Sequence, residues 1–209
     1  MAIQIRVATE VHLPLADQIC EYMRTAAEQR GTGIAKRTPE YVRAKISEGK
    51  AVIALDGEQP VGFCYIETWS HHKYVANSGL IVHPDYRGLG LGKKIKEEIF
   101  KLSRTKYPDA RIFGITTSLA VMKINAELGY KPVTFSELTT DEAFWKGCQS
   151  CKNYDILTRT NQSHCLCTGM MYDPKEKNKA EPVKKEMRWQ RFKRFLQNLK
   201  VNATVKLFI

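Results

Sequence analysis

The sequence predicts an α/β domain in which helices cover both faces of a mixed β-sheet. Strand-like and helix-like periodicities alternate in the order β-α-α-β-β-β-α-β-α-β, followed by a last strand near 164–172. The chain has 209 residues, of which 43% are hydrophobic, which is enough for one sizeable core. It shows neither an apolar run long enough to span a membrane nor a signal-peptide pattern, so a cytoplasmic protein is expected.

Each element is recognised by its own pattern. A helix is predicted over 38–49 because Thr38 can cap its start, Pro39 suits its first turn and Gly49 follows its end. Two apolar runs separated by the turn 56–59 predict a hairpin. The other strands are expected at 3–9, 75–83, 110–117 and 131–138, and the other helices at 13–30, 88–105 and 118–129.

A glycine-rich segment lies between the strand 75–83 and the helix that follows it. It reads Arg87-Gly-Leu-Gly-Leu-Gly92, which matches neither the P-loop nor the dinucleotide-binding fingerprint. Glycine lets a ligand approach the backbone, and the first amides of a helix have no partner within the helix. This arrangement favours a phosphate or pyrophosphate site, although a turn without any ligand would leave the same pattern.

Two segments together indicate a family. "LIVHPDYRGLGLGKKI" resembles the acyl-CoA-binding motif of the GNAT superfamily of N-acetyltransferases, and "VMKINAELGYKPV" resembles that family's later helix-glycine-strand segment. The resemblance covers about 1–137 and the last strand, and implies a mostly antiparallel sheet and acetyl-CoA or another acyl-CoA as co-substrate. It also implies that the pantetheine contacts Leu80, Ile81 and Val82, and that the pyrophosphate contacts the backbone of Arg87, Gly88, Leu89, Gly90, Leu91, Gly92 and Lys93.

Transfer of an acyl group to an amine needs a route for the amine proton and gains from a donor to the leaving thiolate. Where many family members carry a tyrosine four residues before the glycine, this chain has Asn125, whose amide cannot release a proton. Glu67, at the end of a strand, is one candidate base. His71 and His72, in the following loop, are two others, because imidazole titrates near neutral pH.

The loop between the first two helices carries three cations, Arg30, Lys36 and Arg37, among glycines. Guanidinium and ammonium groups suit carboxylates, so a small carboxylate-bearing amine such as an amino acid is one expected acceptor. The same cations would suit the phosphates of a nucleotide sugar, and a solvated basic loop is the plain alternative.

Four cysteines form two close pairs near the end of the predicted domain, which we bound at 1–174. Cys148 and Cys151 form C-x2-C, and Cys165 and Cys167 form C-x-C on the expected last strand, where both sulfurs would share a face. Four thiolates suit a structural zinc ion, which would tie an inserted segment, about 138–163, to the sheet. Buried free thiols and a redox pair are the alternatives.

The remaining segment, 175–209, is strongly basic. It holds eleven lysines and arginines against three glutamates, so eight of the eleven net positive charges of the chain fall there. Its second half predicts an amphipathic helix, with Trp189, Phe192, Leu196 and Leu199 on one face. Such a helix suits packing on its own or a second subunit and hence a homo-oligomer, or less often a membrane or nucleic acid.

Three functional classes follow from these patterns. The first is an enzyme that transfers an acyl group from acyl-CoA to a primary amine by direct attack. The second is an acyl-CoA sensor or scaffold without catalysis, which fits the missing tyrosine. The third is a nucleic-acid-associated module that uses the basic tail.

Overall fold

The computed structural model describes residues 3–30 and 37–177. The chain divides into two compact units, Met1–Asp173 and Pro174–Ile209. The described part of the second unit is the short helix α7 (Pro174–Lys177), so the predicted amphipathic helix lies outside the described residues. Within the described ranges, no helix has the length and apolar character needed to cross a membrane.

The first unit is built on a seven-stranded sheet with the order β1-β2-β3-β4-β5-β7-β6. Only β4 and β5 run parallel, and the other five neighbouring pairs are antiparallel, which confirms the mixed, mostly antiparallel sheet. The strands are β1 (Gln4–Val7), β2 (Ala51–Asp56), β3 (Gln59–Trp69), β4 (Tyr74–Val82), β5 (Arg111–Thr116), β6 (Lys131–Val133) and β7 (Thr168–Tyr172).

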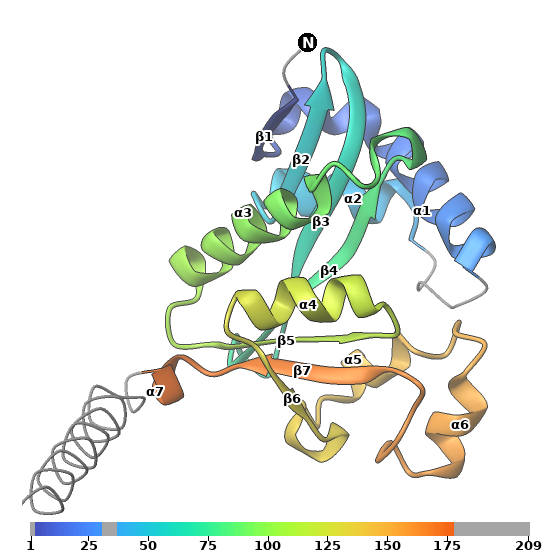
Figure 1. Cartoon of the computed structure of the whole chain (residues 1–209), viewed down its shortest axis with the longest axis vertical. Helices are drawn as coiled ribbons and strands as arrows, with labels where there is room; N and C mark the ends of the chain where they lie inside the picture. Colours follow the sequence, from blue (N-terminus) through green and yellow to red (C-terminus); the bar gives the residue numbers. More distant parts are fainter. Residues whose placement is uncertain (1–2, 31–36, 178–209) are drawn as a thin grey trace, which may run out of the picture. The chain divides into compact units, whose positions relative to one another are not determined.

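Helices cover both faces of this sheet, as expected (Figure 1). On one face, α3 (Leu91–Lys106) and α4 (Leu119–Glu127) pack on a cluster that includes Ile66, Ile95 and Ile112. On the other face, η1 (Glu10–Leu15), α1 (Ala16–Arg30) and α2 (Pro39–Ser47) bury side chains such as Phe63 and Tyr65. That second face continues over β5 and β7 as a third cluster, which holds Phe113 and the helices α5 (Glu142–Lys146) and α6 (Tyr154–Arg159).

Three boundaries differ from the sequence prediction. The helix expected at 88 begins at Leu91, because Gly88 and Gly90 take left-handed φ values of 80° and 74° and the short helix η2 (Pro84–Tyr86) precedes them. The strand expected over 131–138 ends at Val133, where a capping box between Thr134 and Glu137 starts the helix η3 (Phe135–Glu137). The C-x-C pair was expected on the last strand, but β7 begins at 168, just after it.

The parallel pair β4–β5 is joined at only one end. Its pairing runs from Tyr74↔Arg111 to Ala76↔Phe113, whereas β4 continues to Val82 and β5 to Thr116. A β-bulge in β4 lies just beyond this point, where Gly79 has a φ of 66° and the Tyr65 ring lies so close that a Cβ on Gly79 would be 2.2 Å from it. Bulges bend a strand away from its neighbour, so the two strands separate and leave a gap in the sheet.

Candidate active site in the gap of the sheet

A cavity of about 330 Å³ occupies the gap between β4 and β5. Its walls come from both faces of the sheet, because Lys96 of α3 and Val121 of α4 line it together with Glu67 of β3 and Phe144 of α5. The two separated strands supply the walls between these helices, through Asn77, Ser78, Gly79, Leu80, Gly114, Ile115 and Thr116. The cavity is therefore lined from both faces of the sheet.

The glycine-rich segment lies at the open end of this gap. Gly90 caps α3 without a side chain, and the first i→i−4 hydrogen bond is Lys94 N–H to the Gly90 carbonyl, at 3.2 Å. The amides of Leu91, Gly92 and Lys93 thus precede the first bonded turn and sit at the positive end of the helix dipole. A Cβ at Gly88 or Gly90 would meet no atom within 4 Å, so the loop leaves its backbone open to a ligand.

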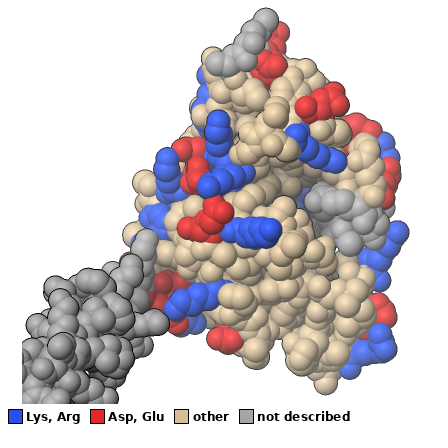
Figure 2. All heavy atoms as spheres, in the orientation of Figure 1, with Lys and Arg blue, Asp and Glu red and all other residues tan. Residues whose placement is uncertain are grey.

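The face that carries α3 and α4 has basic and acidic side chains gathered over these two helices, whereas the surface below α4 is mostly uncharged (Figure 2). An ion pair joins Lys93 of α3 to Glu127 of α4 at 2.7 Å, and both side chains are about half exposed. Arg87 turns back, and its Nε donates to the Val82 carbonyl at 3.3 Å. Arg87 therefore ties the loop to the end of β4.

Glu67 lies on the opposite face, within a cluster of aromatic and basic side chains. The Tyr41 hydroxyl of α2 donates to its carboxylate, and Arg37 Nη2 lies 3.5 Å from the same Oε1. Arg37 Nε donates to the Tyr65 hydroxyl at 2.6 Å, and its guanidinium lies 5.0 Å from the centre of the Tyr41 ring. The Glu67 and Arg37 side chains are only 15% and 18% exposed, so both charges are mostly shielded from water.

The surroundings change the protonation of this cluster. Burial, reinforced by the negative charge of Glu67, raises the pKa of Tyr41 and of Tyr65, so both hydroxyls stay protonated at neutral pH. Burial by itself would lower the pKa of the Arg37 guanidinium. The neighbouring Tyr65 and Glu67 outweigh burial, so the pKa is raised. Burial lowers the pKa of Lys45, whose Nζ lies 4.9 Å from the Tyr41 ring centre.

The other candidate catalytic residues lie elsewhere. His71 and His72 are exposed in the turn between β3 and β4, with φ values of 54° and 65°, and neither lines the cavity. Asn125 is buried on α4, where its Nδ2 donates to Met170 Sδ at 3.8 Å and its Oδ1 has no partner among the described residues. Of the proposed bases, the structure brings only Glu67 to the gap.

The three predicted acceptor-binding cations have different outcomes. Arg37 lines the cavity beside Glu67. Arg30 is the last residue of α1, and its side chain lies outside the described part of the structure. Lys36 falls in the segment 31–36, which is also outside it.

The two cysteine pairs reach the same end of the cavity. Cys148, Cys151, Cys165 and Cys167 all line it, next to α5 and α6. Burial raises the pKa of Cys148 to about 11, and burial together with Cys165 raises that of Cys167 to about 12, so both are thiols at neutral pH. No group of three or more His, Cys, Asp or Glu side chains among residues 3–30 and 37–177 is arranged to hold a metal ion. The four thiols line one cavity, but their arrangement does not confirm the zinc site expected from the spacing.

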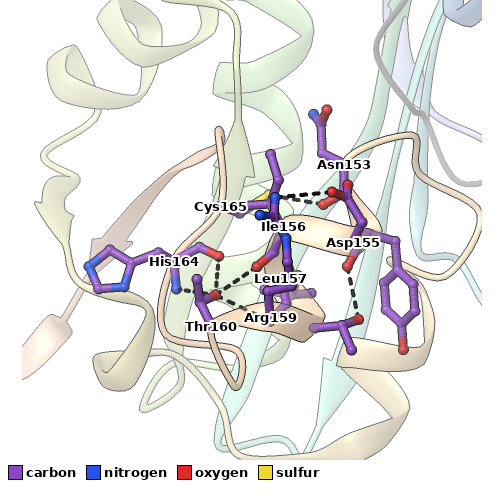
Figure 3. Close-up of polar contacts among 10 residues, drawn as sticks. Asn153, Asp155, Ile156, Leu157, Arg159, Thr160, His164 and Cys165 are labelled. Atoms are coloured by element: carbon purple, nitrogen blue, oxygen red, sulfur yellow. Dashed lines mark hydrogen bonds and ion pairs between the residues drawn. The ribbon is translucent and has the colours of Figure 1, made fainter.

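The segment that carries these pairs is fixed by local hydrogen bonds (Figure 3). The His164 N–H donates to Thr160 Oγ1 at 3.2 Å, and Thr160 Oγ1 lies 2.8 Å from the His164 carbonyl, which closes the turn after α6. Cys165 Sγ lies 4.0 Å from the Asn153 carbonyl, whereas the His164 ring points away from both residues (Figure 3). This turn places Cys165 facing the start of α6.

Sequence reasoning missed three residues of this site. Tyr65 lies two residues before Glu67 on β3, so the two side chains share a face of the sheet. This alternation was a signal from which Tyr65 could have been found. Lys96 falls between Ile95 and Ile99 on the buried face of α3, so its position alone could have marked it as a buried lysine. Tyr41 had no such signal, because its contact with Glu67 spans 26 residues of sequence.

Comparison with known proteins agrees with the fold and the glycine loop. A family model described as an acetyltransferase (GNAT) domain matches residues 47–131, which include β2 to β5, α3 and α4. A search of curated proteins by sequence finds no match.

Three solved structures with a similar fold are 15–21% identical in sequence. N-acetylglutamate synthase from Neisseria gonorrhoeae, complexed with coenzyme A and N-acetyl-glutamate, has a TM-score of 0.59 and 21% identity over 83% of this chain. This chain spans only 35% of that synthase. Rv2747 from Mycobacterium tuberculosis, in complex with CoA, has a TM-score of 0.56 and 17% identity, over 81% of this chain and 98% of its own.

A phosphinothricin acetyltransferase of the GNAT superfamily from Sinorhizobium meliloti, in complex with AcCoA, has a TM-score of 0.55 and 15% identity, over 83% of this chain and 89% of its own. The family model and the shared fold thus agree with the two sequence motifs. Residues 47–131 match a model of the GNAT acetyltransferase domain, and this stretch contains the glycine-rich motif.

Proposed function

We propose that this protein is an N-acyltransferase that moves an acetyl or similar acyl group from acyl-CoA to the primary amine of a small, carboxylate-bearing acceptor. The observation that carries the proposal is the gap in the sheet. It has open helix amides at one end and a shielded carboxylate, Glu67, on the face opposite α3.

The acyl-CoA enters from the face of α3 and α4. Its pyrophosphate accepts hydrogen bonds from the amides of the 87–93 segment, which the helix dipole favours. Its pantetheine runs along the part of β4 from Leu80 to Val82 that has no partner in β5. Proteins with this fold form complexes with CoA or AcCoA, which supports an acyl-CoA as the donor.

The acceptor enters from the face of α1 and α2. Arg37 is the charged group suited to its carboxylate, because a guanidinium binds a carboxylate through two parallel hydrogen bonds. Tyr41 and Tyr65 hold Arg37 and Glu67 in place, so the acceptor meets an ordered pair of charges. The complex of the Neisseria synthase with N-acetyl-glutamate supports an acceptor of this class.

Chemistry then follows from the arrangement. An alkylamine with a pKa near 10 is mostly an ammonium at neutral pH and has no lone pair with which to attack. Glu67 takes one proton from the ammonium and passes it to solvent, and the neutral amine attacks the thioester carbonyl. The nitrogen then gives a second proton to Glu67, and the C–S bond breaks as the amide forms. A backbone N–H at the β4 bulge polarises the carbonyl oxygen in the transition state.

The test is thiol release from acetyl-CoA and succinyl-CoA with matched acceptors. Glutamate, aspartate and glutamine are compared with ethanolamine and putrescine, which lack a carboxylate. We expect turnover with an acceptor that bears an α-carboxylate, and a rise in its KM of at least tenfold in Arg37→Met. Arg159→Met, which removes an arginine on the exposed surface of α6, is the matched control and should behave like wild type.

Two other outcomes would contradict the proposal in different ways. Coenzyme A binding by calorimetry without thiol release for any acceptor would indicate the sensor alternative. Equal turnover of amines with and without a carboxylate would contradict the acceptor class and leave the transfer reaction standing.

A further inference from the structure

Lys96 is a buried lysine at the point where the two parallel strands separate. Its side chain comes from the second turn of α3 and is 2% exposed. Its Nζ donates to the Asn77 carbonyl at 3.2 Å, and Asn77 is the first residue of β4 beyond the last β4–β5 pair, Ala76↔Phe113. Lys96 and Asn77 both line the cavity, so this amine lies at the closed end of the gap.

A hydrogen-bond network holds the closed end rigid. Asn77 Nδ2 donates to Ser103 Oγ at 2.6 Å, and Ser103 Oγ donates to the Ile99 carbonyl at 2.8 Å. The Tyr130 hydroxyl donates to Asn77 Oδ1 at 3.1 Å. Asn77 is thereby fixed to α3 and to the residue before β6, and it fixes in turn the carbonyl that Lys96 contacts.

The groups that face Lys96 leave its charge unbalanced. They are the Asn77 carbonyl, the Tyr130 ring, whose centre is 5.7 Å from Nζ, and the Cys64 thiol of β3. Burial raises the pKa of Tyr130 and brings that of Cys64 to about 11, so both are neutral at neutral pH. In the part of the chain that the structure describes, none of the ion pairs includes Lys96. Burial without a carboxylate lowers the pKa of Lys96.

A buried cation without a counter-ion is costly, and such groups concentrate at functional sites. One bond to a carbonyl uses only one of the three N–H donors of the ammonium. The cavity beside it is therefore the place where an anion would gain most. In the proposed reaction two atoms near the end of the pantetheine become negative. The carbonyl oxygen accepts from the backbone N–H at the β4 bulge, and the thiolate of coenzyme A is left for Lys96.

The position of Lys96 along β4 agrees with a contact to the coenzyme A sulfur. Five residues separate Val82, beside the glycine loop, from Asn77, which at about 3.3 Å per residue is roughly 16 Å. An extended pantetheine arm covers a comparable distance, so a pyrophosphate at the loop brings the sulfur to the closed end of the gap. Asn125, at the position of the family's usual tyrosine, cannot donate a proton there.

We propose that Lys96 stabilises the leaving thiolate of coenzyme A by its positive charge, in the role that a tyrosine proton donor would otherwise fill. This rests on the proposed function. When the amine nitrogen bonds to the carbonyl carbon, the C–S electron pair stays on sulfur and the thiolate is paired with the Lys96 ammonium. The amine proton passes to Glu67, and the thiolate takes up a proton as coenzyme A leaves.

The experiment measures the thiol pKa of bound coenzyme A in the full chain, from thiolate ultraviolet absorbance between pH 6 and 10. A free thiol titrates near 8.5. We expect the bound thiol pKa to fall by at least one unit in wild type, and affinity for coenzyme A relative to desulfo-coenzyme A to rise about tenfold with pH. Both effects should be lost in Lys96→Met and kept in Lys101→Met, a control that removes an exposed lysine from the same helix.

The readouts separate the outcomes. A bound thiol pKa in wild type at or above 8.5 overturns the proposal, whether or not Lys96→Met folds. The proposal is also overturned if Lys96→Met still binds desulfo-coenzyme A and its bound coenzyme A thiol has the same pKa as in wild type. Failure of wild type to bind desulfo-coenzyme A at all overturns the proposed function itself.

Discussion

Replacing Glu67 by glutamine removes the proposed base and preserves most of its surroundings. Glutamine has nearly the same shape, and its amide oxygen can still accept from the Tyr41 hydroxyl. It cannot take up the amine proton. Because a positioned base contributes about 10²–10⁴-fold, kcat/KM at neutral pH should fall by that factor, or by about 2.7 to 5.5 kcal/mol of transition-state stabilisation.

The pH dependence makes this prediction specific. Without a base in the site, the enzyme depends on the fraction of acceptor that is already neutral in solution. The logarithm of kcat/KM for Glu67→Gln should therefore rise with a slope of one until the pH reaches the amine pKa, near 10 for an alkylamine. The loss relative to wild type should shrink over the same range.

The assay is thiol release at saturating acetyl-CoA from pH 6 to 10. Glu58→Gln is the matched control, because Glu58 is an exposed glutamate in the turn between β2 and β3. A Glu67→Gln enzyme within threefold of wild type across that range would refute the assignment of Glu67 as the base.

Three further predictions follow from the same structure. Gly90→Ala places a side chain at a φ of 74°, so the free energy of unfolding in urea should fall by about 1 to 2 kcal/mol. Calorimetry should also show weaker coenzyme A binding. Unchanged values for both would contradict the role of the loop. Burial lowers the pKa of Lys96, so between that pKa and 10.5 the unfolded chain binds more protons than the folded chain. The free energy of unfolding of wild type, relative to Lys96→Met, should therefore rise with pH up to about 10.5. A difference in urea unfolding that does not change with pH would contradict this prediction. Structural zinc stays a prediction from the spacing of the four cysteines: metal analysis should find one zinc per chain, lost in Cys148→Ser/Cys151→Ser and kept in Cys20→Ser, whereas a metal-free chain with four reactive thiols would contradict it.

Much of the fold could be predicted because its signals are local. Alternation, helix caps and turn residues located the strands and helices, and the two family motifs indicated how they pair. The errors fell where local pattern and tertiary packing compete. The run 131–138 alternates like a strand, yet Phe135 is buried against Trp145, so the chain turns into η3 after three residues of β6.

The site was predictable only in part, for a similar reason. The glycine loop is a contiguous motif, and the helix that follows it could be predicted directly from the sequence. The cluster around Glu67 joins α2, β3 and Arg37, which lies two residues before α2. The sequence does not specify which side chains meet across such distances. His71 and His72 were chosen for their chemistry, but the tight turn between β3 and β4 exposes them at the end of the hairpin.

The most direct test of the central claim is a crystal structure of the chain with acetyl-CoA. The account predicts the pyrophosphate on the amides of the 87–93 segment and the thioester in the gap between Asn77 and Gly114. Lys96 would then lie on one face of the sheet and Glu67 on the other. A gap closed by continued β4–β5 pairing, or acetyl-CoA bound away from it, would contradict the account.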